Sequence, residues 1–176
     1  MKMKSLVLGT LLGGLAAFIW SSVSWEVIGW HEKAMLGFQK DEEVAAAISS
    51  HMAADGTYLL PYGTSQEAMD RFRKGPIMVA AVRRGGVGSF ARFMAVQVLS
   101  LVAAAFLLTW LVLQTSGLSY VRRVMFLAVV GLSASVIVDL PNWNWWGFSG
   151  SFTAVNVADN VITWLLAGLV IAKVAK

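Results

Sequence analysis

Four long apolar segments dominate the chain, and shorter polar or basic stretches separate them. Each segment is close to the roughly 20 residues that a helix needs to cross a hydrocarbon core about 30 Å thick. A backbone in contact with lipid must satisfy its own hydrogen bonds, so each segment is expected to be helical. The four predicted spans are Leu6–Trp25, Phe93–Thr115, Val124–Leu140 and Phe152–Ala172.

The stretch between the first and second spans has its own pattern of short elements. Asp41 is a suitable helix cap, and Thr64 with Glu67 has the spacing of a capping box. The expected elements are a helix Asp41–Ala54, a strand Thr57–Leu60, a helix Thr64–Gly75 and a strand Ile77–Val82. Two strands alone are marginally stable, so this small domain is expected to pack against the helix bundle or against a partner for its stability.

These patterns predict an all-α membrane protein, a four-transmembrane-helix bundle with a small extracytoplasmic α/β insertion between helices 1 and 2. The predicted domains are residues 5–30 for the first transmembrane helix, 31–92 for the insertion and 93–176 for the other three helices. Composition agrees with this class. The chain is 57% hydrophobic, holds eight Trp and is only 14% charged, which is too apolar for an ordinary soluble domain.

The chain has a net charge of +4, and its basic residues are placed as expected for a signal of membrane topology and not for a nucleic-acid-binding surface. The short segments at the two ends of the chain and between the second and third spans hold only basic residues: Lys2, Lys4, Arg122, Arg123, Lys173 and Lys176. The stretch 31–92 is nearly neutral, with eight basic and seven acidic residues. By the positive-inside rule both termini are expected in the cytoplasm and the long loop outside, in a bacterial periplasm. Cysteine is absent, which excludes disulfides and thiolate metal sites.

The first apolar segment also resembles a secretory signal, with Ser22-Val23-Ser24 as a cleavage site of small residues. A retained helix is favoured because the apolar run is longer than a usual signal core and is followed by Trp25 and Trp30. Gly9 and Gly13 have the GxxxG spacing that permits close helix contact. The alternative is that these glycines merely occur in a Gly-rich apolar run.

Two isolated acids, Asp139 and Asp159, are the residues most informative about a possible site. An ionised carboxylate in hydrocarbon is energetically unfavourable unless it is paired or hydrated. Asn156, Asp159, Asn160 and Thr163 recur at helical spacing and share one face of the fourth span. Asp139 is expected to end the third span at a similar depth. Glu26 and His31 close the first span on the same side, so the candidate ligand-binding residues are Asp139, Asp159, Asn156, Asn160, Glu26, His31, Trp143 and Trp145.

Three interpretations of this cluster stay open. In the first, the polar side chains bond between helices and fix their register, and Asp139 caps backbone amides ahead of Pro141. In the second, they form a ligand or proton site with perturbed carboxylates. In the third, Asp139, Asp159, Glu26 or His31 hold a divalent metal, although no local ligand spacing supports it. No metal site and no cofactor are predicted.

Other conspicuous residues have structural and functional alternatives. His51 shares a helix face with Val44 and Ile48, which favours packing within the loop domain over ligation. The aromatic stretch Pro141–Phe148 is expected to be a short crossing between spans, whose tryptophans form an interfacial belt or line a recess. The candidate lipid- or phosphate-contacting residues ahead of the second span are Arg83, Arg84 and Arg92, with plain interfacial anchoring as the alternative.

The segment Asp139-Leu140-Pro141-Asn142-Trp143-Asn144-Trp145-Trp146-Gly147-Phe148, followed by Asn156-Val157-Ala158-Asp159, resembles a group of small bacterial four-helix inner-membrane proteins. The similarity extends to the Trp25…Trp30-His31 end of the first span and to Arg122-Arg123. It implies an inner-membrane location and four helices. No established activity attaches to that group, so the resemblance assigns no residue a role.

The function predicted from the sequence is that of an integral inner-membrane accessory or assembly protein acting through contacts with other membrane components. No nucleophile–base pair, phosphate-binding loop or metal signature is visible, so enzymatic activity is left open and not favoured. The alternative is a lipid- or small-molecule-handling protein, with or without catalytic activity, that uses the outer polar cluster. Expected partners are the lipid bilayer and either another membrane protein or a second copy of this chain, with no nucleic acid.

Overall fold

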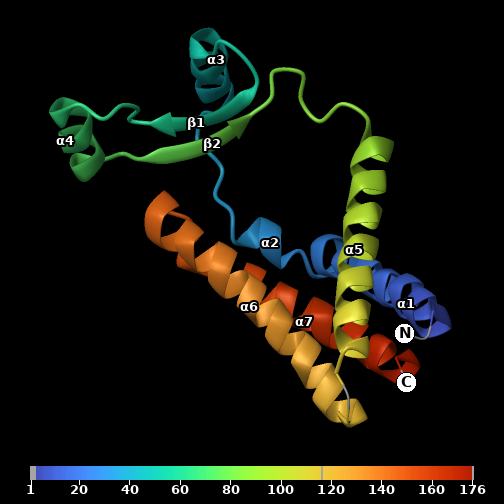
Figure 1. Cartoon of the computed structure of the whole chain (residues 1–176). Helices are drawn as coiled ribbons and strands as arrows, with labels where there is room; N and C mark the ends of the chain where they lie inside the picture. The colour runs from blue at the N-terminus through green and yellow to red at the C-terminus, as the bar shows by residue number, and fades with distance from the viewer. Residues whose placement is uncertain (1–2, 116, 176) are drawn as a thin grey trace.

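A computed structural model describes residues 3–115 and 117–175. The chain is mostly helical, with a two-stranded sheet inserted between its first and second long helices (Figure 1). The elements in chain order are α1 Met3–Ser22, the π-helical turn η1 Val23–Ile28, α2 Trp30–Lys33, α3 Asp41–His51, β1 Gly56–Leu60, α4 Gln66–Lys74, β2 Met78–Val82, α5 Phe90–Leu113, α6 Tyr120–Trp146 and α7 Gly150–Val174.

The four predicted spans are confirmed as helices; three extend beyond both predicted bounds, and the second begins three residues earlier but ends at Leu113, two residues short of Thr115. The helical stretches Met3–Ile28, α5, α6 and α7 are all long and apolar enough to cross a membrane. The last three each begin after a serine, and Ser89, Ser119 and Ser149 accept hydrogen bonds from backbone amides three residues later. A serine cap satisfies an amide that has no partner within the helix, which explains why the helices begin at these residues.

The prediction that Asp139 ends the third span and that Pro141–Phe148 forms a crossing is wrong. α6 continues through Pro141 to Trp146, and Gly147 ends it in the left-handed conformation, at φ 74°. The amide of Phe148 then bonds the Asn142 carbonyl at 3.3 Å, which closes a turn of the kind that commonly ends helices. Proline removes one backbone donor, but a long helix supported by packing tolerates that loss. Only three residues therefore separate α6 from α7.

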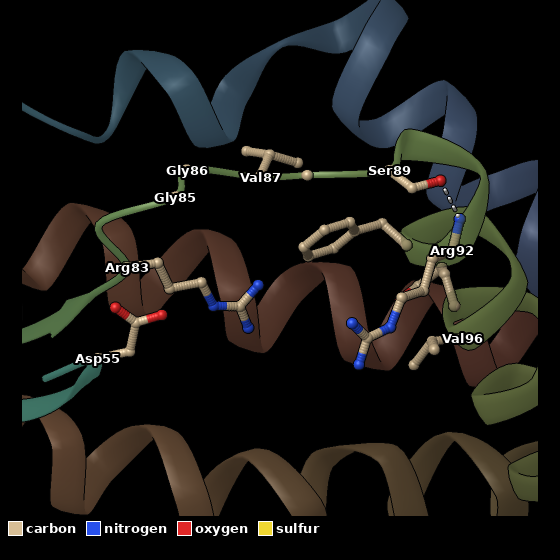
Figure 2. A pocket seen from close by; sticks show the side chains of 11 residues that line it. Asp55, Arg83, Gly85, Gly86, Val87, Ser89, Arg92 and Val96 are labelled. Carbon is tan, nitrogen blue, oxygen red and sulfur yellow. Dashed lines mark hydrogen bonds between the residues drawn. The ribbon is translucent and has the colours of Figure 1, made fainter.

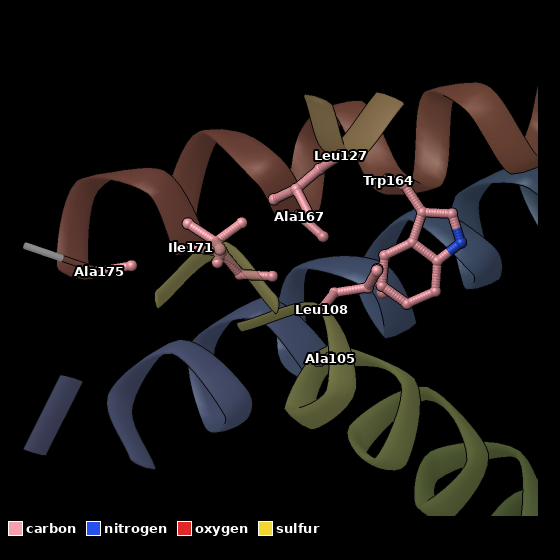
Figure 3. Close-up of a cluster of buried hydrophobic side chains, with 9 residues drawn as sticks. Ala105, Leu108, Leu127, Trp164, Ala167, Ile171 and Ala175 are labelled. Atoms are coloured by element: carbon pink, nitrogen blue, oxygen red, sulfur yellow. The ribbon is translucent and has the colours of Figure 1, made fainter. Parts of the chain in front are cut away.

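Small residues let α1 approach its neighbours closely. A Cβ atom added at Gly9 would lie 2.4 Å from the Thr109 side chain of α5, and one at Gly13 would lie 2.6 Å from Ile171 of α7. The two glycines thus contact two different helices, and the close-contact interpretation of their spacing is confirmed. A hydrophobic cluster lies beside them, where Leu108 of α5 and Trp164 of α7 point toward one another (Figure 3).

The inserted segment forms the predicted α-β-α-β domain with two shifted helix bounds. β1 and β2 pair antiparallel from Gly56↔Val82 to Leu60↔Met78. α3 ends at His51 and not near Ala54. Ser65, not Thr64, caps α4, because its side chain accepts the Ala68 amide. α3 and α4 lie at opposite ends of the hairpin, beyond the ends of the long helices (Figure 1).

α5 is the least supported of the long helices. Its buried residues all lie in the half nearer α6, between Ala105 and Val112. The first eleven residues, 90–100, are exposed except for the half-buried Met94. α5 packs mainly against α1, and it diverges from α6 with distance from the connection that joins them (Figure 1).

Candidate functional site

The end of the first long helix and the short helix α2 bring Trp25 and Trp30 against His31, with Trp20 beside Trp30. The π-helical turn η1 has wider hydrogen-bond spacing than an α-helix, a feature that is rare and often found at functional sites. Gly29 then ends this turn at φ 61°, a left-handed conformation that suits glycine. The indole of Trp30 donates to Ser24 Oγ at 2.8 Å, which pins α2 against the turn.

His31 is the centre of this arrangement and is 2% exposed. Its ring stacks on Trp25 with centroids 4.1 Å apart and planes 7° apart. Trp30 approaches the same ring edge-on at 5.8 Å. Stacked and edge-on contacts are both favourable geometries for aromatic rings. The imidazole is therefore enclosed by its own neighbours and is not open to a ligand.

Asp159 of α7 connects this arrangement to the rest of the helices. Its Oδ1 accepts a hydrogen bond from the Trp20 indole at 2.7 Å. Its Oδ2 lies 3.7 Å from His31 Nε2. A hydrogen bond to an ionised acceptor contributes about 1.5–3 kcal/mol, more than a neutral one. The carboxylate thus ties α1 and α2 to α7.

Burial lowers the pKa of His31 below its usual value of 6.5, and the opposing attraction of the Asp159 carboxylate offsets only part of this effect. Desolvation disfavours the charged imidazolium, which is why the first cause prevails. His31 is accordingly neutral near pH 7 in the folded protein. Its Nδ1 is buried without a hydrogen-bond partner among the residues that the structure describes.

α6 and α7 form a second polar contact through regular antiparallel packing. Leu127 lies against Gly168, and Gly131 lies against Trp164. One turn further along α6, Ser135 accepts a hydrogen bond from the Asn160 amide at 3.0 Å. Each successive contact lies four residues further along α6 and four residues earlier in α7. The two packing contacts and the Ser135–Asn160 bond therefore fix the register of the helix pair.

The same register places Asp139 opposite Asn156, one turn beyond the Ser135–Asn160 bond. Asp139 is half-buried, and its Oδ2 has no hydrogen-bond partner within residues 3–115 and 117–175. Because α6 continues past it, Asp139 does not cap the end of a helix. That part of the structural interpretation is wrong, and the carboxylate instead lies on the α7-facing side of α6.

The predicted cluster is thus only partly assembled. The structure brings together Asp159 and His31, and separately Asn160 with Ser135. Glu26 is exposed and joins neither contact. Trp143 lies over α7 beside Thr153, and Trp145 with Trp146 lines a recess against the loop domain. Among the described residues, no three His, Cys, Asp or Glu side chains gather to hold a metal ion.

Sequence reasoning missed Trp20 and Ser24 as partners in the site. A signal was present, because Trp20, Trp25 and Trp30 are spaced five residues apart and a buried indole N–H requires an acceptor. The π-helical turn that gathers them has no simple sequence signature. His51 is exposed at the recess between α3 and the sheet, and its Nδ1 lies 2.9 Å from the Ala47 carbonyl of its own helix, so its packing role stays a prediction.

Arg83 and Arg84, which precede α5, and Arg92, in its first turn, do not act together. The side chain and backbone amide of Arg84 both approach Asp55 Oδ1, at 3.6 and 3.1 Å. Arg83 and Arg92 instead line an open pocket at the start of α5 (Figure 2).

The chain matches no family model, no curated protein and no solved structure. The resemblance to bacterial four-helix membrane proteins therefore stays a prediction.

Proposed function

We propose that this chain is a multi-pass membrane protein that acts through contact with a transmembrane helix of another membrane protein, in an accessory or assembly role. The uncovered outer half of α5 is the observation that carries the proposal. Leu99 is 66% exposed there, and Ile137 on the neighbouring α6 is 73% exposed. A helix that packs along only half its length leaves room for a further helix beside it.

The filled aromatic cluster also supports a contact role over a ligand-handling role. Trp25 and Trp30 pack against the His31 ring, and Asp159 accepts the Trp20 indole and lies 3.7 Å from His31, so these groups contact one another. Such a closed contact rigidifies the end of α1 and holds the loop domain near the outer half of α5. The alternative function, lipid or small-molecule handling at Asp139 and Asp159, is less favoured because Asp159 already accepts the Trp20 indole beside His31.

The proposed location is a bacterial inner membrane with both termini in the cytoplasm and residues 31–92 in the periplasm. Charge supports this orientation, because Lys4, Arg122, Arg123 and Lys173 lie in or beside the short segments at one end of the helices. Arg123 donates to the Ala175 carbonyl, so the start of α6 and the end of α7 share that end. Lys2 and Lys176 belong to the same charge pattern but lie outside the described residues.

Site-specific photo-crosslinking tests the proposal. A photoreactive residue at position 99 should yield adducts with a second protein in intact membranes. Leu15 of α1 is the matched control, because it is also an apolar helix residue and is 53% exposed. Adducts with lipid alone at both positions, or equal protein adducts at both, would contradict a specific partner helix on α5.

A further inference from the structure

An open pocket of ≈ 660 Å³ lies where the connection after β2 meets the first turns of α5. One wall is the Gly-rich segment that follows Arg83, and the other is the face of α5 that carries Arg92, Phe93 and Val96. Figure 2 shows the side chains of Arg83 and Arg92 extending toward one another into this space. The pocket is separate from the aromatic cluster around His31.

The pocket carries excess positive charge. The acid at its edge is Asp55, whose Oδ1 accepts the Arg84 amide and pairs with the Arg84 side chain, so the two arginines of the pocket outnumber this single acid. Neither Arg83 nor Arg92 forms a salt bridge with any residue that the structure describes. Two guanidinium groups that face the same space repel one another unless an anion lies between them. The arrangement therefore favours an anionic ligand.

Local contacts hold the two arginines in place. The Arg83 guanidinium lies 5.2 Å from the centre of the Phe93 ring, a cation–π contact that positions the group and leaves its N–H donors free. The Ser89 side chain caps α5 by accepting the Arg92 amide, which fixes the first turn that carries Arg92. The positive end of the α5 dipole adds to the potential, although this contribution is minor beside two full charges.

The pocket also has an apolar side that continues along a membrane-spanning helix. Phe93 and Val96 form its floor, and Leu99 extends the same exposed surface one turn further into the span. α5 begins at Phe90, so the arginines lie at the depth of lipid headgroups if the helix crosses a bilayer. Guanidinium groups bind phosphate oxygens through paired N–H donors, which suits this site to a phosphate group.

We propose that Arg83 and Arg92 bind the phosphate of an anionic phospholipid headgroup, whose acyl chains lie along Phe93 and Val96. The proposal depends on the membrane placement given above but not on the partner helix. It assigns Arg84 no part in the site. Simple interfacial anchoring makes a different prediction, because any of the three arginines would then contribute equally through charge alone.

The test measures lipid binding to the purified full-length protein in detergent by native mass spectrometry. The probes are phosphatidylglycerol, a dialkylglycerol without phosphate, glycerol phosphate and inorganic phosphate. Arg83→Gln and Arg92→Gln should each weaken phosphatidylglycerol binding about tenfold to a hundredfold, the loss expected for one charge-assisted hydrogen bond. Arg84→Gln, which removes the same charge from the adjacent residue, should change binding by less than about twofold. Unchanged thermal unfolding of each variant confirms that it is folded.

Arg83→Lys separates charge from geometry, because lysine keeps the positive charge but cannot form the paired contact. Weakened binding by this variant supports the proposal. Equal losses for all three glutamine variants, or equal binding of the dialkylglycerol, would overturn it. Glycerol phosphate or inorganic phosphate that bound as tightly as phosphatidylglycerol, with the same dependence on Arg83 and Arg92, would overturn the lipid assignment in favour of a soluble phosphate compound.

Discussion

The close approach of α6 and α7 at Gly131 makes a quantitative prediction for Gly131→Ala. The added Cβ would lie 2.8 Å from Trp164 Cδ1 and 2.9 Å from the Asn160 carbonyl oxygen. A flexible side chain could move aside, but the carbonyl belongs to the backbone of α7. The two helices must therefore separate by several tenths of an ångström, and the Ser135–Asn160 bond lies one turn away.

The expected change in the free energy of unfolding is the sum of two destabilising effects and one stabilising effect. Overpacking in a well-packed contact costs about 1–3 kcal/mol. Alanine regains up to about 1 kcal/mol because it is a better helix former than glycine. The strained Ser135–Asn160 bond adds about 0.6 kcal/mol, the average for polar contacts between membrane helices. Gly131→Ala should therefore lower the free energy of unfolding by about 0.5–2.5 kcal/mol.

Unfolding in mixed micelles of increasing sodium dodecyl sulfate content, followed by tryptophan fluorescence, measures this free energy. Gly150→Ala is the matched control, because Gly150 is also a helical glycine of the α6–α7 pair, yet a Cβ there would meet nothing within 4 Å. The control should be as stable as the native chain or slightly more stable. If Gly131→Ala were as stable as Gly150→Ala, the close contact and the helix register derived from it would be wrong.

Three further predictions concern the aromatic cluster and the topology. Stability should be highest above pH 6.5 and should fall as the pH drops from 6.5 through the lowered pKa of His31, because the unfolded chain takes up the proton first. Unfolding curves recorded from pH 7.5 to 5 measure this dependence of stability on pH. His31→Gln should remove the part of it that comes from His31. Trp20→Phe deletes the indole donor to a partly buried carboxylate and should cost about 1–3 kcal/mol in the micelle unfolding assay. Trp145→Phe, at a residue that is 67% exposed, should change stability by less than about 0.5 kcal/mol, and equal effects of the two substitutions would contradict the assigned hydrogen bond. Because the chain has no cysteine, Gln39→Cys and Gln114→Cys each introduce a unique thiol. A membrane-impermeant maleimide should label the first in intact cells and the second only after permeabilisation, and the reverse pattern would overturn the proposed orientation.

Local patterns predicted the elements well where a single physical rule controls them. The four spans follow from the length of each apolar run, and the antiparallel strands follow from two β-prone runs in a short insertion. The same rules failed at Pro141, where proline suggested the end of a helix. α6 continues through Pro141 with the loss of one backbone donor, and the left-handed Gly147 ends it six residues later.

The candidate site, too, was predicted from the sequence only in part. Helical spacing correctly placed Asp159 and Asn160 on faces that meet other helices, because spacing along one helix is a local property. It could not show that Asp159 meets Trp20 and His31 while Asn160 meets Ser135. Those partners are distant along the chain, and which of them meet depends on how the helices cross.

The sequence by itself determined that the chain forms four apolar helices with a small sheet between the first two, because hydrophobic length and strand propensity act over a few neighbouring residues. The tertiary structure alone decided which polar groups become partners, that a π-helical turn encloses His31, and that Arg83 and Arg92 share a pocket while Arg84 pairs with Asp55. The physical reason is that these contacts depend on helix crossing and on one irregular turn. Both are set by the packing of glycines, tryptophans and leucines from segments far apart in the chain.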